Sequence, residues 1–410
     1  MFRASTSACT NWYQNLKMSL RNKIAYGRKV LPSGIWRALS APVCEPMHLV
    51  IAVADHFEPA IDPEDGQKRV PRSEQERRLQ WWSREYPKAV DSWRDHDGRP
   101  LVHTYFYPAE QYDECLVEML AEHCHAGWGE IEIHLHHGIP HPDTAENARH
   151  LLTDFRDRLV FRHRCLAAEE SSSQPRYCFV HGNFALANSA EGRFCGVDSE
   201  IKILAETGCY ADFTLPTSIL HPAQTAKINS LYECGLPLEQ AAPHKTGIDL
   251  SVGRAPRIFP LIVQGPLLPD FGRSRRAFRP VFETAAITQP NPMSLHRLAL
   301  WKRARIHVAG RPDWLFIKLH CHSMDPTQKD AVVGNPFRKF LEQLVGGAEE
   351  RQEILHFVTA REMANIILAA CDGKDGNPGQ YRDYRFKLFR DLPAAAEKSD
   401  SLPVSVSVKG

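Results

Sequence analysis

Short apolar runs alternate with helical stretches through most of this chain, and that alternation limits the possible folds more than any other feature. The first apolar run is 48–54, and an expected helix at 73–93 separates it from the next run at 101–106. Six more strands are expected, at 130–137, 176–181, 210–214, 258–263, 314–320 and 354–359. Strands that alternate with helices pair in parallel as βαβ units. We therefore predict an α/β fold, a (β/α) barrel of about seven parallel strands that is closed or nearly closed.

Length and local composition predict the domain organisation. The 410 residues, of which 43% are hydrophobic, are enough for one large domain or for two. We expect an N-terminal extension at 1–44, the main body at 45–372 and a partly disordered tail at 373–410. The segment 214–257 is too long for an ordinary connection, and we predict that it is an insertion that covers the substrate.

Charge and hydropathy exclude several classes of protein. The formal net charge is only +1, which gives no overall attraction to nucleic acid. No apolar stretch approaches the roughly 20 residues that span a bilayer, and the N-terminus lacks the apolar core of a signal peptide, so we expect a cytoplasmic protein. The 11 cysteines have no CxxC spacing, which argues against a disulfide framework.

A group of three histidines in the expected strand 130–137 predicts a metal site. His134 and His136 are two residues apart, so in a strand they point to the same face, about 6.5–7 Å apart along the backbone. Neutral imidazole is the commonest side-chain ligand of zinc and related ions. We expect one divalent ion, zinc in preference to others, bound by His134 and His136. A surface strand of a histidine-rich chain is the alternative.

Polar clusters recur where the expected strands end. These clusters are Asp55 with His56, His134 with His136, His181 with Asn183, Asp212 alone, and His320 with His322. The C-terminal ends of the strands are where α/β barrels place their active sites. Five such clusters therefore indicate one common pocket.

With these residues in place, the chain resembles a divergent member of the polysaccharide deacetylase superfamily over residues 46–372. In that family the first strand ends in an aspartate pair, in which one aspartate is the general base and the other binds the metal. The matching position here reads Asp55 and His56, so the resemblance implies that Asp55 is the base and that His56 replaces the second aspartate as a ligand. The family's late-strand histidine, a general acid, is matched by His320.

The family's other motifs are altered. Its two metal-binding histidines, four residues apart before a proline, are matched by His137 and His141, although we favour His134 and His136 as ligands. The candidates for further ligands or supporting groups are His137, His141, His322 and Glu58. The arginine-and-proline motif is absent, and the segment around His181 takes its place. We expect His181, Asn183 and Asp212 at the substrate, while a loop cap or a buried hydrogen bond is an equally open interpretation of His181 and Asn183.

The predicted function is that of a metal-dependent hydrolase of amide bonds, a deacetylase that removes an N-acyl group from an amino sugar or a glycan. One alternative is a glycosidase on the same barrel, with two carboxylates from Asp55, Asp212 or Glu58 placed about 5–5.5 Å apart and no metal. The other alternative is a glycan-binding relative without catalysis. Such a relative would bind the metal but hydrolyse no acetylated sugar.

Overall fold

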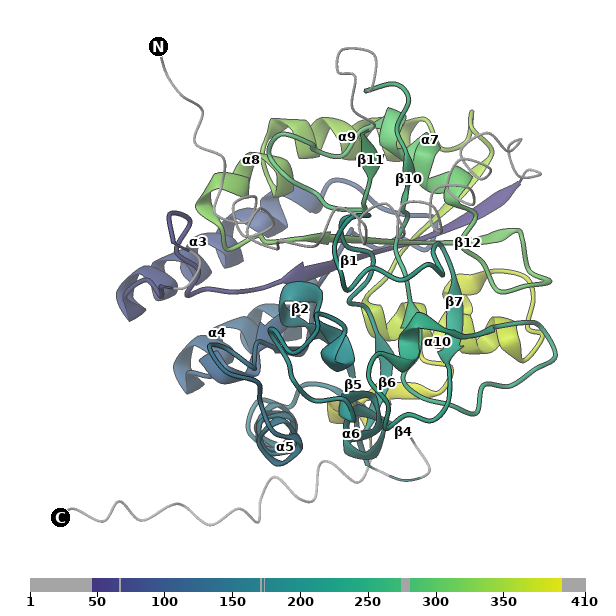
Figure 1. Ribbon diagram of the computed structural model, residues 1–410. Coiled ribbons are helices and arrows are strands. Elements are labelled where there is room, and N and C mark those ends of the chain that lie inside the picture. The colour runs from purple at the N-terminus through teal and green to yellow at the C-terminus, as the bar shows by residue number, and fades with distance from the viewer. Residues whose placement is uncertain (1–45, 66–67, 170–171, 173, 274–280, 393–410) are drawn as a thin grey trace.

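The computed structural model describes residues 46–65, 68–169, 172, 174–273 and 281–392 (Figure 1). The expected N-terminal extension at 1–44 and residues 393–410 of the expected tail lie outside the described residues.

A mostly parallel sheet forms the centre of the molecule. Seven strands pair in parallel, namely, in sheet order, β12 (Trp314–Cys321), β1 (Met47–His56), β2 (His103–Pro108), β3 (Gly129–Leu135), β5 (Pro175–His181), β6 (Cys209–Asp212) and β9 (Leu261–Val263). The strand β13 (Glu353–Phe357) pairs in parallel with the first half of β1. Every strand expected from the apolar runs overlaps one of these, so the prediction of an α/β fold with a parallel sheet is confirmed. Among the described strands no pairing joins β9 to β12, so the closed barrel is not observed.

The predicted insertion at 214–257 contributes two strands to this sheet. The strand β7 (Leu231–Cys234) pairs antiparallel with β9, and β8 (Gly247–Asp249) pairs antiparallel with β7. An antiparallel hairpin can be added to the edge of a parallel sheet without a crossover helix. The second half of the segment 214–257, which we expected to cover the substrate, therefore extends the sheet.

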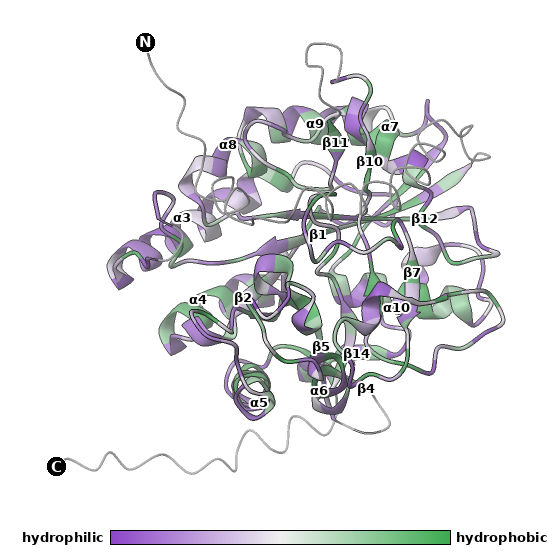
Figure 2. Cartoon of the chain, in the orientation of Figure 1, coloured by the Kyte–Doolittle hydropathy of each residue, from purple (hydrophilic) through white to green (hydrophobic). Residues whose placement is uncertain are grey.

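Helices cover one face of the sheet and bury the larger part of the core against it. They are α3 (Arg72–Val90), α4 (Glu114–His123), α5 (Ala145–Phe161), α6 (Glu200–Thr207), α7 (Leu295–Ala304), α8 (Lys329–Val332) and α9 (Asn335–Gly346). In α3 the buried Leu79, Trp82 and Tyr86 are three or four residues apart, which is the spacing of one helix face. Figure 2 shows hydrophilic and hydrophobic residues side by side along α4 and α5, as this arrangement requires.

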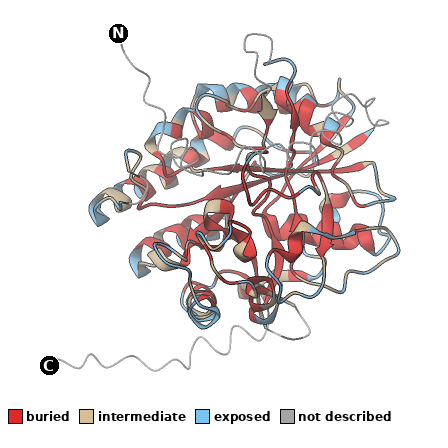
Figure 3. Ribbon diagram, viewed as in Figure 1, coloured by how far each residue is buried: buried red, intermediate tan, exposed pale blue. Residues whose placement is uncertain are grey.

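The opposite face of the sheet packs against α10 (Ala360–Cys371). Val50, Ala52 and Ala54 of β1 point to this side and join one apolar cluster with Phe316 and the side chains of α10. All residues of α10 are buried (Figure 3), and a capping box between Thr359 and Glu362 closes the N-terminus of the helix. The strand β1 is therefore apolar on both sides, as is typical of a parallel sheet that is covered on both faces.

The described part of the expected C-terminal tail packs on the body. The strand β14 (Phe386–Leu388) pairs antiparallel with β4 (Ala167–Glu169), and the guanidinium of Arg382 binds Asp95 at 3.1 Å and Asp97 at 2.8 Å. The short strands β10 (Leu268–Pro269) and β11 (Phe282–Glu283) form a separate pair. The described cysteines are free thiols. None of the described helices combines the length and the apolar character that a membrane crossing needs.

Candidate metal centres

The C-terminal ends of β1, β3 and β12 bring five histidines together. The ring of His56 lies between three others, with centroid distances of 5.0 Å to His134, 4.6 Å to His322 and 5.8 Å to His320. The fifth ring, that of His136, lies 4.5 Å from the ring of His134. Because parallel strands end at the same edge of the sheet, histidines far apart in sequence become neighbours here.

Hydrogen bonds fix the orientation of the two histidines of β3. Nδ1 of His134 lies 2.7 Å from the carbonyl oxygen of Val180, and Nδ1 of His136 lies 3.0 Å from Oε1 of Glu110. Both oxygens can only accept a hydrogen bond, so we assign the proton to Nδ1 in both rings. The Nε2 atoms then point to Oε1 of Glu58, which is 3.7 Å from His134 and 3.0 Å from His136.

Glu58, His134 and His136 form a group that could hold a metal ion, with their ligand atoms within 4.8 Å of one another. The donor set, one carboxylate oxygen and two imidazole nitrogens, suits zinc. The ring nitrogens that face away are held by a carbonyl and a carboxylate, which is the usual arrangement around metal-binding histidines. A β-carbon at Gly182 would clash with the His136 ring, so the absence of a side chain there permits this ring position.

The charges of this group favour a cation between its members. Burial opposes a charge on His136, but the carboxylates of Glu110 and Glu58 outweigh it and raise the pKa of His136 to about 10. Burial also opposes ionisation of Glu58, yet His134 and His136 hold its pKa well below the usual value. Burial and the neighbouring His136 lower the pKa of His134. A divalent ion would satisfy the same electrostatic demand as the proton on His136.

His322, His56 and His320 complete the surroundings of this group. Nε2 of His322 lies 3.8 Å from Oε2 of Glu58, and the side chains of His322 and His136 are 24% and 22% exposed, so solvent reaches the group from this side. Within the described residues, Nε2 of His56 and Nδ1 of His320 are buried without a hydrogen-bond partner. Burial lowers the pKa of both rings well below the usual value. Both rings are therefore neutral near pH 7.

Asp55, expected to be the general base, points away from the histidines. Its Oδ2 lies 3.0 Å from Nδ1 of His103, and its Oδ1 accepts the backbone N–H of Ser323 at 2.9 Å. The His103 ring packs on Trp82 and Tyr86 of α3, on the helix-covered face of the sheet. Successive residues of a strand point to opposite faces, so His56 reaches the histidines and Asp55 cannot. Asp55 therefore lies apart from these five histidines, in a third group with His103 and Cys321 whose ligand atoms lie within 4.8 Å of one another, and Glu58 supplies the carboxylate beside the five histidines.

His137 and His181 belong to a second buried group. Together with Cys195 and Glu200 they could hold a metal ion, with the four ligand atoms within 4.8 Å of one another. The expected partner of His137, His141, is exposed in the loop after β3. Sequence reasoning missed Cys195 and Glu200, because neither stands at a recognisable ligand spacing from a histidine.

Asp212, expected at the substrate, makes local hydrogen bonds, whereas the buried Nδ2 of Asn183 has no hydrogen-bond partner among the described residues. Asp212 accepts hydrogen bonds from the backbone N–H of Thr214 at 3.1 Å and from its hydroxyl at 2.7 Å. Burial raises the pKa of Asp212 to about 7 and lowers the pKa of the neighbouring Lys318 to about 7. Asn183 has a left-handed backbone, with φ of 55°, in the turn after β5. The hydrogen bonds of Asp212 agree with a supporting role in the loop after β6.

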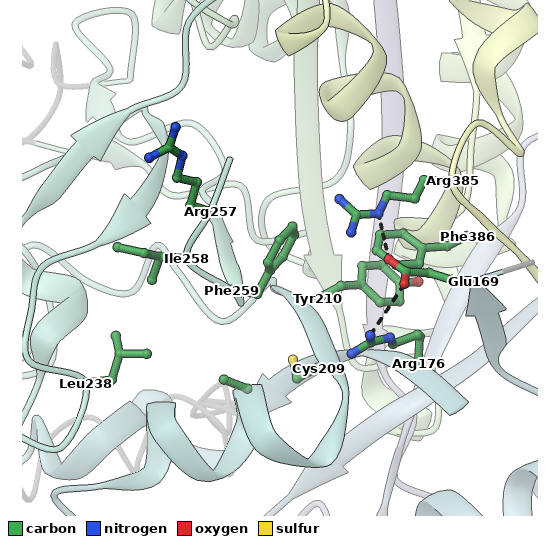
Figure 4. A pocket seen from close by; sticks show the side chains of 11 residues that line it. Glu169, Arg176, Cys209, Tyr210, Leu238, Arg257, Ile258, Phe259, Arg385 and Phe386 are labelled. Carbon is green, nitrogen blue, oxygen red and sulfur yellow. Dashed lines mark hydrogen bonds and ion pairs between the residues drawn. The ribbon is translucent and has the colours of Figure 1, made fainter. Parts of the chain in front are cut away.

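A cavity of about 320 Å³ lies beside the start of β5, at the end of that strand opposite to His181 (Figure 4). Arg176, Arg385 and Phe259 are among its lining residues. Glu169 lies between the two guanidinium groups, 3.5 Å from that of Arg176 and 2.6 Å from that of Arg385. Because Arg176 and Arg385 are already paired with Glu169 and no histidine lines it, this cavity is not the centre of the predicted metal chemistry.

No protein-family model matches the chain, and no curated protein matches it at a significant level.

Proposed function

We propose that this protein is a metal-dependent hydrolase that removes an N-acyl group from an amino sugar or a glycan. In this proposal Glu58, His134 and His136 bind one divalent ion, zinc in preference to others. His322 and His56 border the ion. The sheet is a distorted (β/α) barrel of the polysaccharide deacetylase type, and the protein acts in the cytoplasm.

The orientation of His134 and His136 carries the proposal. A carbonyl and a carboxylate hold the outer nitrogens, so both inner nitrogens point at the carboxylate of Glu58. Three protein ligands beside a solvent-exposed edge are typical of catalytic zinc sites, which keep a position for water or substrate, whereas structural sites are closed.

Hydrolysis of an amide needs both an electrophile and proton transfer. A zinc ion at this group would polarise the amide carbonyl and bring the pKa of a bound water toward 7. We assign proton transfer to His320 and His56, because both rings are neutral and each has an unpartnered nitrogen. A neutral ring can give a proton only after it has accepted one, so His320 would first take the proton of the attacking water and then pass it to the leaving amine, which is the donor role that the resemblance implies.

The carboxylates of the site give less support to the glycosidase alternative. Glu58 and Glu110 bind opposite nitrogens of the same His136 ring, at 3.0 Å each. Asp55 and Asp212 are buried and occupied by other hydrogen bonds. A glycosidase needs one free carboxylate and one protonated carboxyl group across the scissile bond.

An acetate-release screen tests the proposal. The zinc-loaded protein is incubated with N-acetylated monosaccharides and oligosaccharides, beside the variant His134→Ala/His136→Ala and a control variant of two exposed histidines, His125→Ala/His150→Ala. We expect release by the wild type and the control and none by the site variant. Bound zinc without release from any substrate would favour the non-catalytic relative. Release that persists in the site variant would exclude this metal site.

A further inference from the structure

The second buried group combines four side chains from separate segments. His137 follows β3, His181 ends β5, Cys195 lies in the loop after β5, and Glu200 begins α6. His181, Cys195 and Glu200 have no exposed surface, and His137 is 6% exposed. Polar groups this deeply buried need partners that satisfy them.

With both histidine rings neutral, their hydrogen bonds leave a cluster of acceptors without a donor. Nδ1 of His137 lies 2.8 Å from Oδ2 of Asp143, and Nδ1 of His181 lies 2.5 Å from the carbonyl oxygen of Gly182. Each of these partners can only accept, so the proton of each neutral ring is on Nδ1. The two Nε2 atoms then face each other with their lone pairs, 3.0 Å apart. Oε1 of Glu200 lies 2.9 Å from one and 3.3 Å from the other.

Backbone N–H groups orient the other two members of the group, Cys195 and Glu200. Sγ of Cys195 accepts the backbone N–H groups of Asn188 at 3.3 Å and Val197 at 3.4 Å, an arrangement that stabilises a thiolate. Oε2 of Glu200 accepts the backbone N–H of Ala187 at 2.6 Å, so Oε1 is directed at the histidines. Each ligand atom is thus oriented by the protein, as around bound metals.

We propose that His137, His181, Cys195 and Glu200 bind a second metal ion, a structural zinc. Two imidazole nitrogens, a thiolate and a carboxylate form a complete tetrahedral set for this ion. The site is closed on all sides, unlike the group around Glu58, and so has no position for a substrate. This inference does not depend on the proposed hydrolase function.

The position of the site suggests its role. The chain between His181 and Cys195 is irregular, with positive φ at the non-glycine residues Asn183, Phe184, Ala187, Asn188, Glu191 and Phe194. Such conformations are unfavourable and need support from the surrounding structure. Phe184 in this segment lies 6.1 Å from the rings of both His56 and His320. The zinc would fasten both ends of a loop that forms a wall of the first site.

Metal analysis after chelation gives the first test. The full-length protein is loaded with zinc, treated with EDTA under native conditions and analysed for metal. The open site should lose its ion, and about one zinc per chain should remain in the closed site. The variant His134→Ala/His136→Ala should retain this zinc as well. A wild-type protein that retains no zinc would overturn the inference.

Cobalt substitution identifies the ligand. Two of the described candidate metal groups contain a cysteine, this one with Cys195 and the group of Asp55, His103 and Cys321, so the cysteine variants decide which of them gives a sulfur-to-cobalt charge-transfer band. Cys195→Ala should abolish the band. The control Cys321→Ala, which removes the thiol of the other group, should keep it. A band that persists in Cys195→Ala, or a cobalt-loaded wild type without a band, would contradict the assignment.

Should Cys195→Ala fail to fold, X-ray absorption of the variant Cys321→Ala tests the site, because that variant lacks the thiol of the other cysteine-containing group. After chelation, the zinc edge should show one sulfur neighbour at about 2.3 Å and nitrogen or oxygen neighbours at about 2.0–2.2 Å. A zinc shell without sulfur would refute the site.

Discussion

The carboxylate of Glu110 should control the metal affinity of the first site without touching the ion. It binds His136 twice, at Nδ1 over 3.0 Å and at the backbone N–H over 3.2 Å. Glu110→Gln removes the negative charge and leaves one acceptor for these two donors. Loss of such an outer partner typically lowers metal affinity by about 10–100-fold. We expect a loss near the upper end, about 2.7 kcal/mol, because both carboxylate oxygens are used.

Competition with a chromophoric chelator measures this affinity for zinc. Glu118→Gln is the matched control, since Glu118 binds Nδ1 of His163 at 2.6 Å outside both metal groups. We expect wild-type affinity for the control. An unchanged affinity in Glu110→Gln, or an equal loss in both variants, would show that Glu110 does not control the metal affinity.

Three further predictions concern individual side chains. Asp55→Asn should lower the free energy of unfolding, measured in urea, by about 1–3 kcal/mol, because it weakens the buried contact with His103. The same variant should leave kcat nearly unchanged. A large loss of kcat without a loss of stability would show that Asp55 is the general base. The pKa of the Asp212 carboxyl is raised to about 7, so the group stabilises the folded state fully below its unfolded pKa of about 3.9, and this stabilisation is lost as the pH rises through 7. In urea titrations, the stability of Asp212→Asn relative to the wild type should therefore increase by up to about 4 kcal/mol between pH 4 and pH 8. A stability difference that stays constant with pH would count against the raised pKa. His320→Ala should lower kcat more for an amide than for an activated aryl ester, whose leaving group departs without a proton; equal losses would assign His320 to binding.

The parallel sheet and the pairing of His134 with His136 could be predicted because both depend on local patterns. Alternation along a strand fixes which residues share a face. When a strand is buried on both sides, this alternation does not predict which of its two faces carries the functional residues. The strand β1 is apolar on both faces from Leu49 to Ala54, so nothing in its sequence distinguishes the side of Asp55 from the side of His56.

Other parts of the structure depend on contacts that no local pattern encodes. The strands β7 and β8 have four and three residues, too few for a periodic signal. Cys195 and Glu200 reach the histidines through an irregular loop whose path is set by left-handed residues and not by spacing. The second metal group could therefore be recognised only in three dimensions.

Anomalous diffraction at the zinc edge, from crystals grown with zinc, locates the metal ion of the first site directly. We predict an anomalous peak bound by Oε1 of Glu58 and Nε2 of His134 and His136, at about 2.0–2.2 Å from each. A zinc-saturated crystal with no peak at His134 and His136, or with the accessible ion bound at Asp55 instead, would contradict it.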